Sequence, residues 1–112
     1  SVQNDLILKE IYTKIRMKQY LIFANDATDE KALERRMEVR PRHFEYIKKM
    51  KASGNFVIGG AQLSEEEIMN GSAIILQFET EADLQQYLAN EPYILEGVWG
   101  EYKVIPFKVA TV

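Results

Sequence analysis

The alternation of apolar and polar residues divides this chain into short strands and longer helices. Apolar runs rich in β-forming residues predict strands at residues 19–24, 56–60, 72–78 and 101–109. Pro106 lies in the last of these runs, and a proline that cannot donate to a sheet ladder favours an edge strand or a bulge there. Residues 63–71, with three consecutive glutamates, are expected to be a polar connection between the second and third strands.

The helices are predicted from apolar spacing and from capping residues. Thr28 or Asp29 is expected to cap a long helix that ends near Ala52, before Ser53-Gly54. Thr80 is expected to cap a second helix that continues to about residue 89, with acidic residues in its first turn, and the sequence from Asn90 to Tyr93 ends it. The order is therefore β-α-β-β-α-β. It predicts an α+β domain of the ferredoxin-like type, with both helices on one face of a four-stranded antiparallel sheet.

The first sixteen residues precede this pattern. Leu8, Ile11, Tyr12 and Ile15 follow helical spacing and predict one amphipathic helix. We interpret residues 1–16 as an appended helix and residues 17–112 as the domain. Met17 is a candidate natural start, which would place residues 1–16 upstream of the native chain.

The strands are apolar on both faces. In the first strand Tyr20 and Ile22 point one way while Leu21 and Phe23 point the other, and the third and fourth strands repeat this pattern. A sheet with helices on one face and water on the other would alternate between apolar and polar residues. A second cover is therefore expected. A homodimer packed sheet to sheet is the simplest one, and the amino-terminal helix is the rival.

The long helix carries the candidate chemistry. Its apolar stripe is predicted to consist of Leu33, Met37, Phe44 and Ile47. Arg40 falls within this stripe, and Arg36 and His43 lie along its edge. Residues 36, 40 and 43 are spaced i, i+4 and i+7, so the three side chains lie on one side of the helix. A guanidinium that faces a core needs an acidic partner, either internal or bound. Pro41 is expected to kink the helix or to mark its restart.

Two interpretations of this cluster are open. In the functional one, the arginines bind an anionic substrate by bidentate hydrogen bonds, and His43, with an ordinary pKa of about 6.5, transfers a proton. In the structural one, Arg36 and Arg40 pair with acidic residues of the same domain and His43 only packs at the edge of the stripe.

The composition of the chain excludes several classes of protein. The chain has 112 residues, 46% of them hydrophobic, so it is expected to form one domain with a real core. Its formal charge of −3 argues against nucleic-acid binding. It has no cysteine and one histidine, which excludes thiolate catalysis and multi-histidine metal sites. No apolar run is long enough to span a membrane, and no secretory signal is visible, so we expect a cytoplasmic protein.

Several short motifs together resemble the YCII-related domain family, from about Met17 to Lys108. They are Arg36-x-x-x-Arg40-x-x-His43, Gly60, Gly71-Ser72, Glu91-Pro92-Tyr93, Gly97 and Val104-x-Pro106-Phe107. The resemblance implies a dimeric ferredoxin-like α+β barrel. It also implies kinship with muconolactone isomerases and chloromuconolactone dehalogenases, which remove a proton beside a carbonyl.

The resemblance also assigns roles to residues. It pairs His43 with Glu91, where the family has an aspartate, and Asp26 is a second candidate partner. Gly60, Ser72 and Tyr93 join the two arginines as substrate-binding residues, and Gly60-Ala61 stands where the family often has Gly-Pro. Packing or dimer contact is the alternative role of Tyr93 and Trp99.

The expected function is therefore that of a lyase or isomerase acting on a small carboxylate or lactone, with no cofactor or metal. The alternative is a non-catalytic module of the same fold that binds a small anion or a partner.

Overall fold

The structure is a computed structural model that describes the backbone of residues 1–112 and the side chains of residues 1–12 and 16–112. Its sheet consists of β1 (Lys18–Asp26), β2 (Phe56–Leu63), β3 (Met69–Phe78) and β4 (Trp99–Phe107). Its helices are α1 (Val2–Arg16), α2 (Ala32–Ala52), α3 (Glu81–Asn90) and the short α4 (Pro92–Leu95). The strand order is β2-β3-β1-β4, and every pairing is antiparallel. This order confirms the ferredoxin-like α+β prediction.

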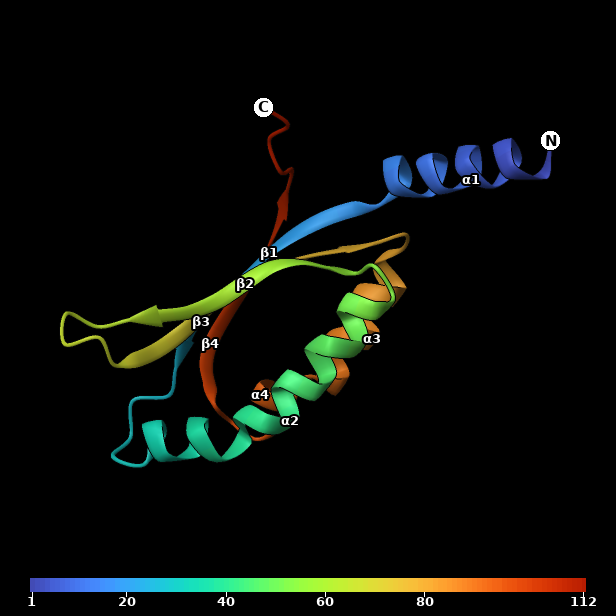
Figure 1. Cartoon of the computed structure of the whole chain (residues 1–112). Coiled ribbons are helices and arrows are strands. Elements are labelled where there is room, and N and C mark those ends of the chain that lie inside the picture. Colours follow the sequence, from blue (N-terminus) through green and yellow to red (C-terminus); the bar gives the residue numbers. More distant parts are fainter.

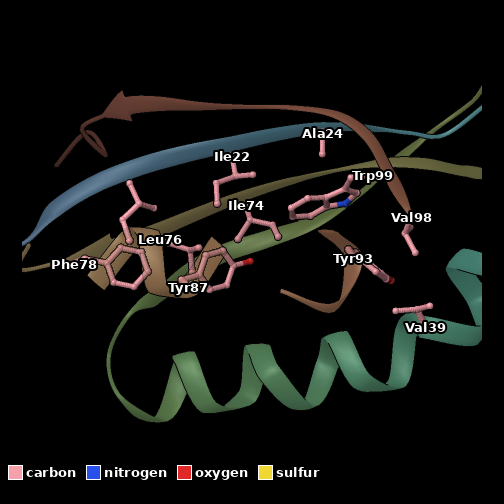
Figure 2. Packing of buried hydrophobic residues seen from close by; sticks show 11 residues of the cluster. Ile22, Ala24, Val39, Ile74, Leu76, Phe78, Tyr87, Tyr93, Val98 and Trp99 are labelled. Carbon is pink, nitrogen blue, oxygen red and sulfur yellow. The ribbon is translucent and has the colours of Figure 1, made fainter. Parts of the chain in front are cut away.

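The core lies between the sheet and the helices α2, α3 and α4, which cover one face of it (Figure 1). Ile22, Ile74 and Leu76 project from the central strands β1 and β3 toward this side (Figure 2), and each is almost completely buried. Tyr87, Tyr93 and Trp99 complete the same cluster. Alternation along the strands therefore sends one apolar set into the core, as the sequence predicts.

The opposite face of the sheet is uncovered in the single chain. Leu21 pairs with Ile75 on one side and with Ile105 on the other, so three apolar residues lie in a row across the central strands. Phe23 and Phe107 lie on the same face and are about two-fifths exposed. This face has the apolar character that the sequence predicts.

Helix α1 does not cover the open face. It continues directly from the start of β1 and projects away from the sheet (Figure 1). Its apolar side chains Leu8, Ile11 and Tyr12 are all at least half exposed, whereas the Ile15 side chain lies outside the described residues. In the described part of the chain, no helix has the length and apolar character needed to cross a membrane.

The predicted apolar stripe of α2 is wrong for three of its four residues. Leu33, Met37 and Phe44 are more than two-fifths exposed, whereas Ile47 packs against the core as predicted. The buried residues of the helix are Arg36, Val39 and His43. The helix is rotated so that the polar side chains Arg36 and His43 face the sheet together with Val39. This orientation is stable because buried carboxylates from other parts of the chain pair with Arg36 and His43. The spacing of residues along the helix cannot reveal such partners.

Helix α2 begins later than predicted. Neither Thr28 nor Asp29 caps it, because Ala32 is the first helical residue and Lys31 precedes it without a side-chain cap. Asp29 instead accepts hydrogen bonds from the Arg35 guanidinium. Pro41 lies inside one continuous helix, whose ribbon bends between its teal and green parts (Figure 1). Of the two alternatives for Pro41, the kink is therefore observed and the restart is not.

Several boundaries also differ from prediction. The predicted polar connection at residues 63–71 is shorter in the structure and covers residues 64–68, since β2 extends to Leu63 and β3 begins at Met69. A tight turn joins them, in which Ser64 N donates to Ile68 O at 2.8 Å. The cap of α3 is as predicted: Thr80 accepts a hydrogen bond from Asp83 N at 3.2 Å. Pro106 lies in the edge strand β4, as expected.

Candidate functional site

A cavity of about 280 Å³ lies between α2 and the strands β2 and β3. Its wall on the helix side includes Arg36, Arg40, His43 and Phe44. On the opposite side, Gly59 pairs with Ile74 and Ala61 with Ser72, so both small residues share the face that looks toward α2. The cavity exists because these two positions of β2 carry little or no side chain. The remaining wall residues are Ile47, Lys48, Phe56, Gly60, Met69 and Tyr93.

His43 and Glu91 form a buried pair at this cavity. The Nδ1 atom of His43 lies 2.5 Å from Oε1 of Glu91, and the glutamate is completely buried. A carboxylate has no hydrogen to donate, so Nδ1–H is the donor in this pair, and in the neutral imidazole the lone pair is then on Nε2 at the other side of the ring. Among the described side chains, none hydrogen-bonds to Nε2. His43 and Glu91, which the family resemblance pairs, are therefore in direct contact in the structure.

Glu91 is held by three donors. Tyr93 N donates to Oε1 at 3.1 Å, and the Tyr87 hydroxyl donates to Oε2. Burial, and then the charge of Glu91, raise the pKa of Tyr87 well above its usual value, so this phenol remains a donor. Glu91 ends α3 and also caps α4, which fixes its backbone on both sides. Pro92 at the first position of α4 suits this geometry, since its ring presets φ and it lacks an N–H.

Tyr93 fixes the plane of the imidazole. Its ring stacks on His43 with centroids 3.9 Å apart and planes 7° from parallel. Its hydroxyl is buried and has no hydrogen-bond partner among the described residues. Burial raises the pKa of Tyr93, while the nearby Arg36 and Arg40 act in the opposite direction. Tyr93 therefore packs in the core and also lines the cavity, and its role in substrate binding stays a prediction.

A second polar cluster is built around Arg36. Its Nη1 donates to both carboxylate oxygens of Asp26, at 2.8 and 3.1 Å, and its Nη2 donates to Ser72 Oγ at 3.0 Å. Trp99 Nε1 donates to the same hydroxyl oxygen at 3.1 Å. Burial raises the pKa of Asp26, and the charge of Arg36 lowers it. All four side chains are nearly inaccessible to solvent.

The two arginines predicted to bind an anion therefore differ. Arg36 is paired inside the domain, so the structural interpretation holds for its charge. Arg40 is only half-buried, lines the cavity and lies over the Phe44 ring at 4.3 Å. Among the residues that the structure describes, no carboxylate pairs with it. Arg40 is the one of the pair that remains available for an external anion.

Asp26 is not the partner of His43. Its carboxylate is occupied by Arg36 at the end of β1, whereas Glu91 takes the histidine. The predicted substrate-binding residues Gly60, Ser72 and Tyr93 all line the cavity. Sequence reasoning missed Tyr87 and gave Trp99 only a packing or interface role. Tyr87 stands one helical turn before Glu91, a spacing that places the two side chains next to each other.

The described side chains contain no group of three or more His, Asp or Glu residues that could hold a metal ion.

The fold and this cavity define a ferredoxin-like α+β protein with a buried histidine–carboxylate pair. The sequence pattern of the YCII-related domain matches residues 18–108, and the chain belongs to this family. An uncharacterised protein of Haemophilus influenzae is 32% identical over 95 residues, which cover 80% of this chain and 95% of that protein.

Two solved structures are similar in fold. The 5-chloro-2-hydroxyhydroquinone dehydrochlorinase TftG of Burkholderia phenoliruptrix, in complex with 2,5-dihydroxybenzoquinone, superposes with a TM-score of 0.69 at 23% identity. The match covers 82% of this chain and 95% of TftG. A dimeric protein of unknown function and ferredoxin-like fold from Bacteroides fragilis has a TM-score of 0.52 at 14% identity, over 84% of this chain and 97% of its own. At 23% and 14% sequence identity, these two structures are evidence for the fold alone.

Proposed function

We propose that the protein is a cofactor-independent lyase or isomerase that acts on a small carboxylate or lactone. One observation carries this proposal: His43 is oriented by buried Glu91 in the wall of a cavity that also holds Arg40, a cation without a described carboxylate partner. The pair supplies a base, and Arg40 supplies a counter-charge for an anionic substrate. Both groups are needed for acid–base chemistry on a charged molecule.

The proposed step is proton abstraction beside a carbonyl. Nε2 of His43 takes the proton, the C–H electron pair moves onto the carbonyl oxygen, and an enolate forms. Glu91 stabilises the resulting imidazolium through Nδ1–H. In an isomerisation, the imidazolium returns the proton to a different carbon. In an elimination, the enolate collapses, the bond to the leaving group breaks with its electron pair, and the proton is later lost to solvent.

The apolar parts of the wall suit a small ring. Ile47, Phe56 and Ile74 contribute hydrocarbon surface to the wall that also includes Arg40. TftG, whose structure contains a small oxygenated ring, is a dehydrochlorinase, and its likeness to this chain supports a ligand of this class. The cavity volume of about 280 Å³ suits a ligand at the small end of those that protein pockets hold.

The direct test is turnover of a muconolactone and of a chlorinated hydroxyhydroquinone, followed by initial rates between pH 5 and pH 9. We expect His43→Ala to lower kcat/KM by about 100- to 10,000-fold, the range that general acid–base catalysis supplies. Glu91→Gln should lower it by at least about 100-fold, because the amide no longer stabilises the imidazolium. Equal turnover by wild type and His43→Ala would rule out the proposed base.

A non-catalytic anion-binding module is the second candidate, and the unpaired charge of Arg40 favours it. This alternative predicts that small organic acids raise the melting temperature without any turnover. Arg40→Gln should remove that protection while the fold stays intact. Lys49→Gln, on the same helix but outside the cavity wall, is the matched control and should keep it.

We also propose that the protein is a homodimer that buries the open face of the sheet. Leu21, Ile75 and Ile105, together with Phe23 and Phe107, present apolar surface that no described part of the single chain covers. Surfaces of this kind mark interaction sites in soluble proteins. A second copy of this chain has the same face and matches it in character.

A further inference from the structure

The hydroxyl of Ser72 has an orientation that follows from its partners. Its oxygen accepts hydrogen bonds from Arg36 Nη2 at 3.0 Å and from Trp99 Nε1 at 3.1 Å. A guanidinium and an indole N–H can only donate. Both lone pairs of the serine oxygen are therefore used, and its own hydrogen must point toward a third group. Among the described residues, no acceptor takes that hydrogen.

The surroundings hold the hydroxyl in this state. Asp26 fixes Arg36 through two hydrogen bonds, and Ser72 is only 2% exposed, so bulk water does not compete for its lone pairs. The guanidinium charge also draws electron density from the serine oxygen, which strengthens the O–H as a donor. Ser72 lies in the wall of the cavity, opposite Ala61 on β2. A group in the cavity is thus the available acceptor.

We propose that the Ser72 hydroxyl donates a hydrogen bond to the oxygen of the substrate that becomes negative when His43 removes the proton. This inference rests on the proposed function and deepens it. The substrate is then a molecule whose acidic C–H lies beside a carbonyl, such as a lactone or a ketone, and not a simple carboxylic acid. The step is the enolisation described above: the C–H bond breaks, Nε2 gains the proton, and the electron pair resides on the oxygen that Ser72 contacts.

Asp26, Arg36 and Trp99 act as positioning residues in this arrangement. They do not need to touch the substrate, since their effect passes through the serine oxygen. A donor that is oriented before the reaction stabilises a developing oxyanion without reorganisation during the step. This gives the buried Arg36–Asp26 pair a role beyond packing.

The test separates binding of an enolate from binding of a carboxylate. Isothermal titration would compare 2,5-dihydroxybenzoquinone, whose acidic enol oxygens resemble an enolate, with benzoate, which needs only Arg40. We expect Ser72→Ala to weaken the quinone at least about tenfold and to change benzoate less than twofold. Turnover on any substrate found for the wild type should show a kcat lower by about 100- to 1000-fold with KM nearly unchanged.

Two further variants guard against a folding defect. Ser72→Thr restores a hydroxyl and should recover most of the quinone affinity. Trp99→Phe frees one lone pair of Ser72 and should give a smaller loss than Ser72→Ala. Ser53→Ala, at an exposed serine outside the cavity, is the control and should match wild type.

The outcomes are distinguishable. If wild type binds neither probe and turns over no substrate, the proposed function fails. If wild type binds both probes and Ser72→Ala binds them equally well, the site stands and the role of Ser72 is overturned. If Ser72→Thr fails to recover affinity although it is folded, the hydroxyl is not the donor and the inference is also overturned.

Discussion

At the scale of single residues, the site depends on how each buried charge is compensated. Glu91 receives three donors, and Asp26 neutralises the charge of Arg36, whose Nε alone has no hydrogen-bond partner among the described residues. Arg40 differs because its head is only half-buried and keeps contact with water. Compensation inside the domain explains why two neighbouring arginines on one helix have different roles.

The first residue-scale prediction concerns the Arg36–Asp26 pair. Asp26→Asn keeps the shape of the side chain but leaves a buried guanidinium without a counter-charge. We expect the free energy of unfolding to fall by about 3 to 5 kcal/mol, measured by urea denaturation at pH 7. Asp29→Asn is the matched control, because it breaks an exposed pair with Arg35, and it should stay close to wild type. Equal losses in both variants would contradict the importance of burial.

The second residue-scale prediction concerns the contribution of Tyr87 to the pH dependence of stability. Because burial and Glu91 raise its pKa in the native state, the native protein keeps the phenol proton at a pH where the unfolded chain has lost it. This contribution to stability is fully present below about pH 10 and is lost as pH rises toward the native pKa, with a slope of about 1.4 kcal/mol per pH unit for one group. Tyr87→Phe should have a shallower decline between pH 9.5 and pH 11. If the stabilities of wild type and Tyr87→Phe decline in parallel as pH rises, the raised pKa of Tyr87 is contradicted.

At the scale of elements, β2 shows how strand alternation makes a cavity. Gly59 and Ala61 face α2, whereas Gly60 pairs with Ala73 on the other face of the sheet. A Cβ at Gly60 would meet no heavy atom within 4 Å, and its φ is not in the left-handed region. The two neighbouring positions therefore point to opposite faces of one strand.

We predict that Ala61→Leu fills the cavity and that Gly60→Ala does not. In a thermal-shift assay, Ala61→Leu should lose the stabilisation that a ring-sized organic acid gives to wild type, while both variants stay folded. Gly60 lines the cavity with backbone atoms only, so Gly60→Ala should keep that stabilisation because its new methyl group lies on the far face of the sheet. Loss of stabilisation in Gly60→Ala but not in Ala61→Leu would contradict the placement of the cavity on the α2 side of β2.

At the scale of the whole molecule, one face of the sheet is packed and the other is open. The helices bury only one of the two apolar sets, and α1 leads away from the sheet (Figure 1). The proposed dimer accounts for the second set without any further element.

The corresponding prediction concerns mass in solution. Wild type should elute in light-scattering chromatography at twice the chain mass of 13.0 kDa. Ile75→Lys places a charge in the centre of the open face and should give a monomer that is still folded by circular dichroism. Leu95→Lys, at an exposed apolar residue of α4, should remain dimeric. A wild-type monomer at micromolar concentration would contradict the proposed interface.

The sequence by itself determined the order of the strands and longer helices, both sets of strand residues and the presence of His43, Arg36 and Arg40 on one helix, whereas the short helix α4 was not predicted. These are local properties: periods of two and of 3.6 residues and the chemistry of caps are read along the chain. The family motifs added the pairing of His43 with Glu91.

Only the tertiary structure decided which face of α2 is buried and which acid meets which base. Leu33 and Met37 have a clear apolar spacing, yet they lie at the surface, because the buried carboxylates Asp26 and Glu91 lie where Arg36 and His43 can reach them. Such pairings join residues 10 and 48 positions apart, and their energy depends on burial and distance in space, which sequence spacing does not encode.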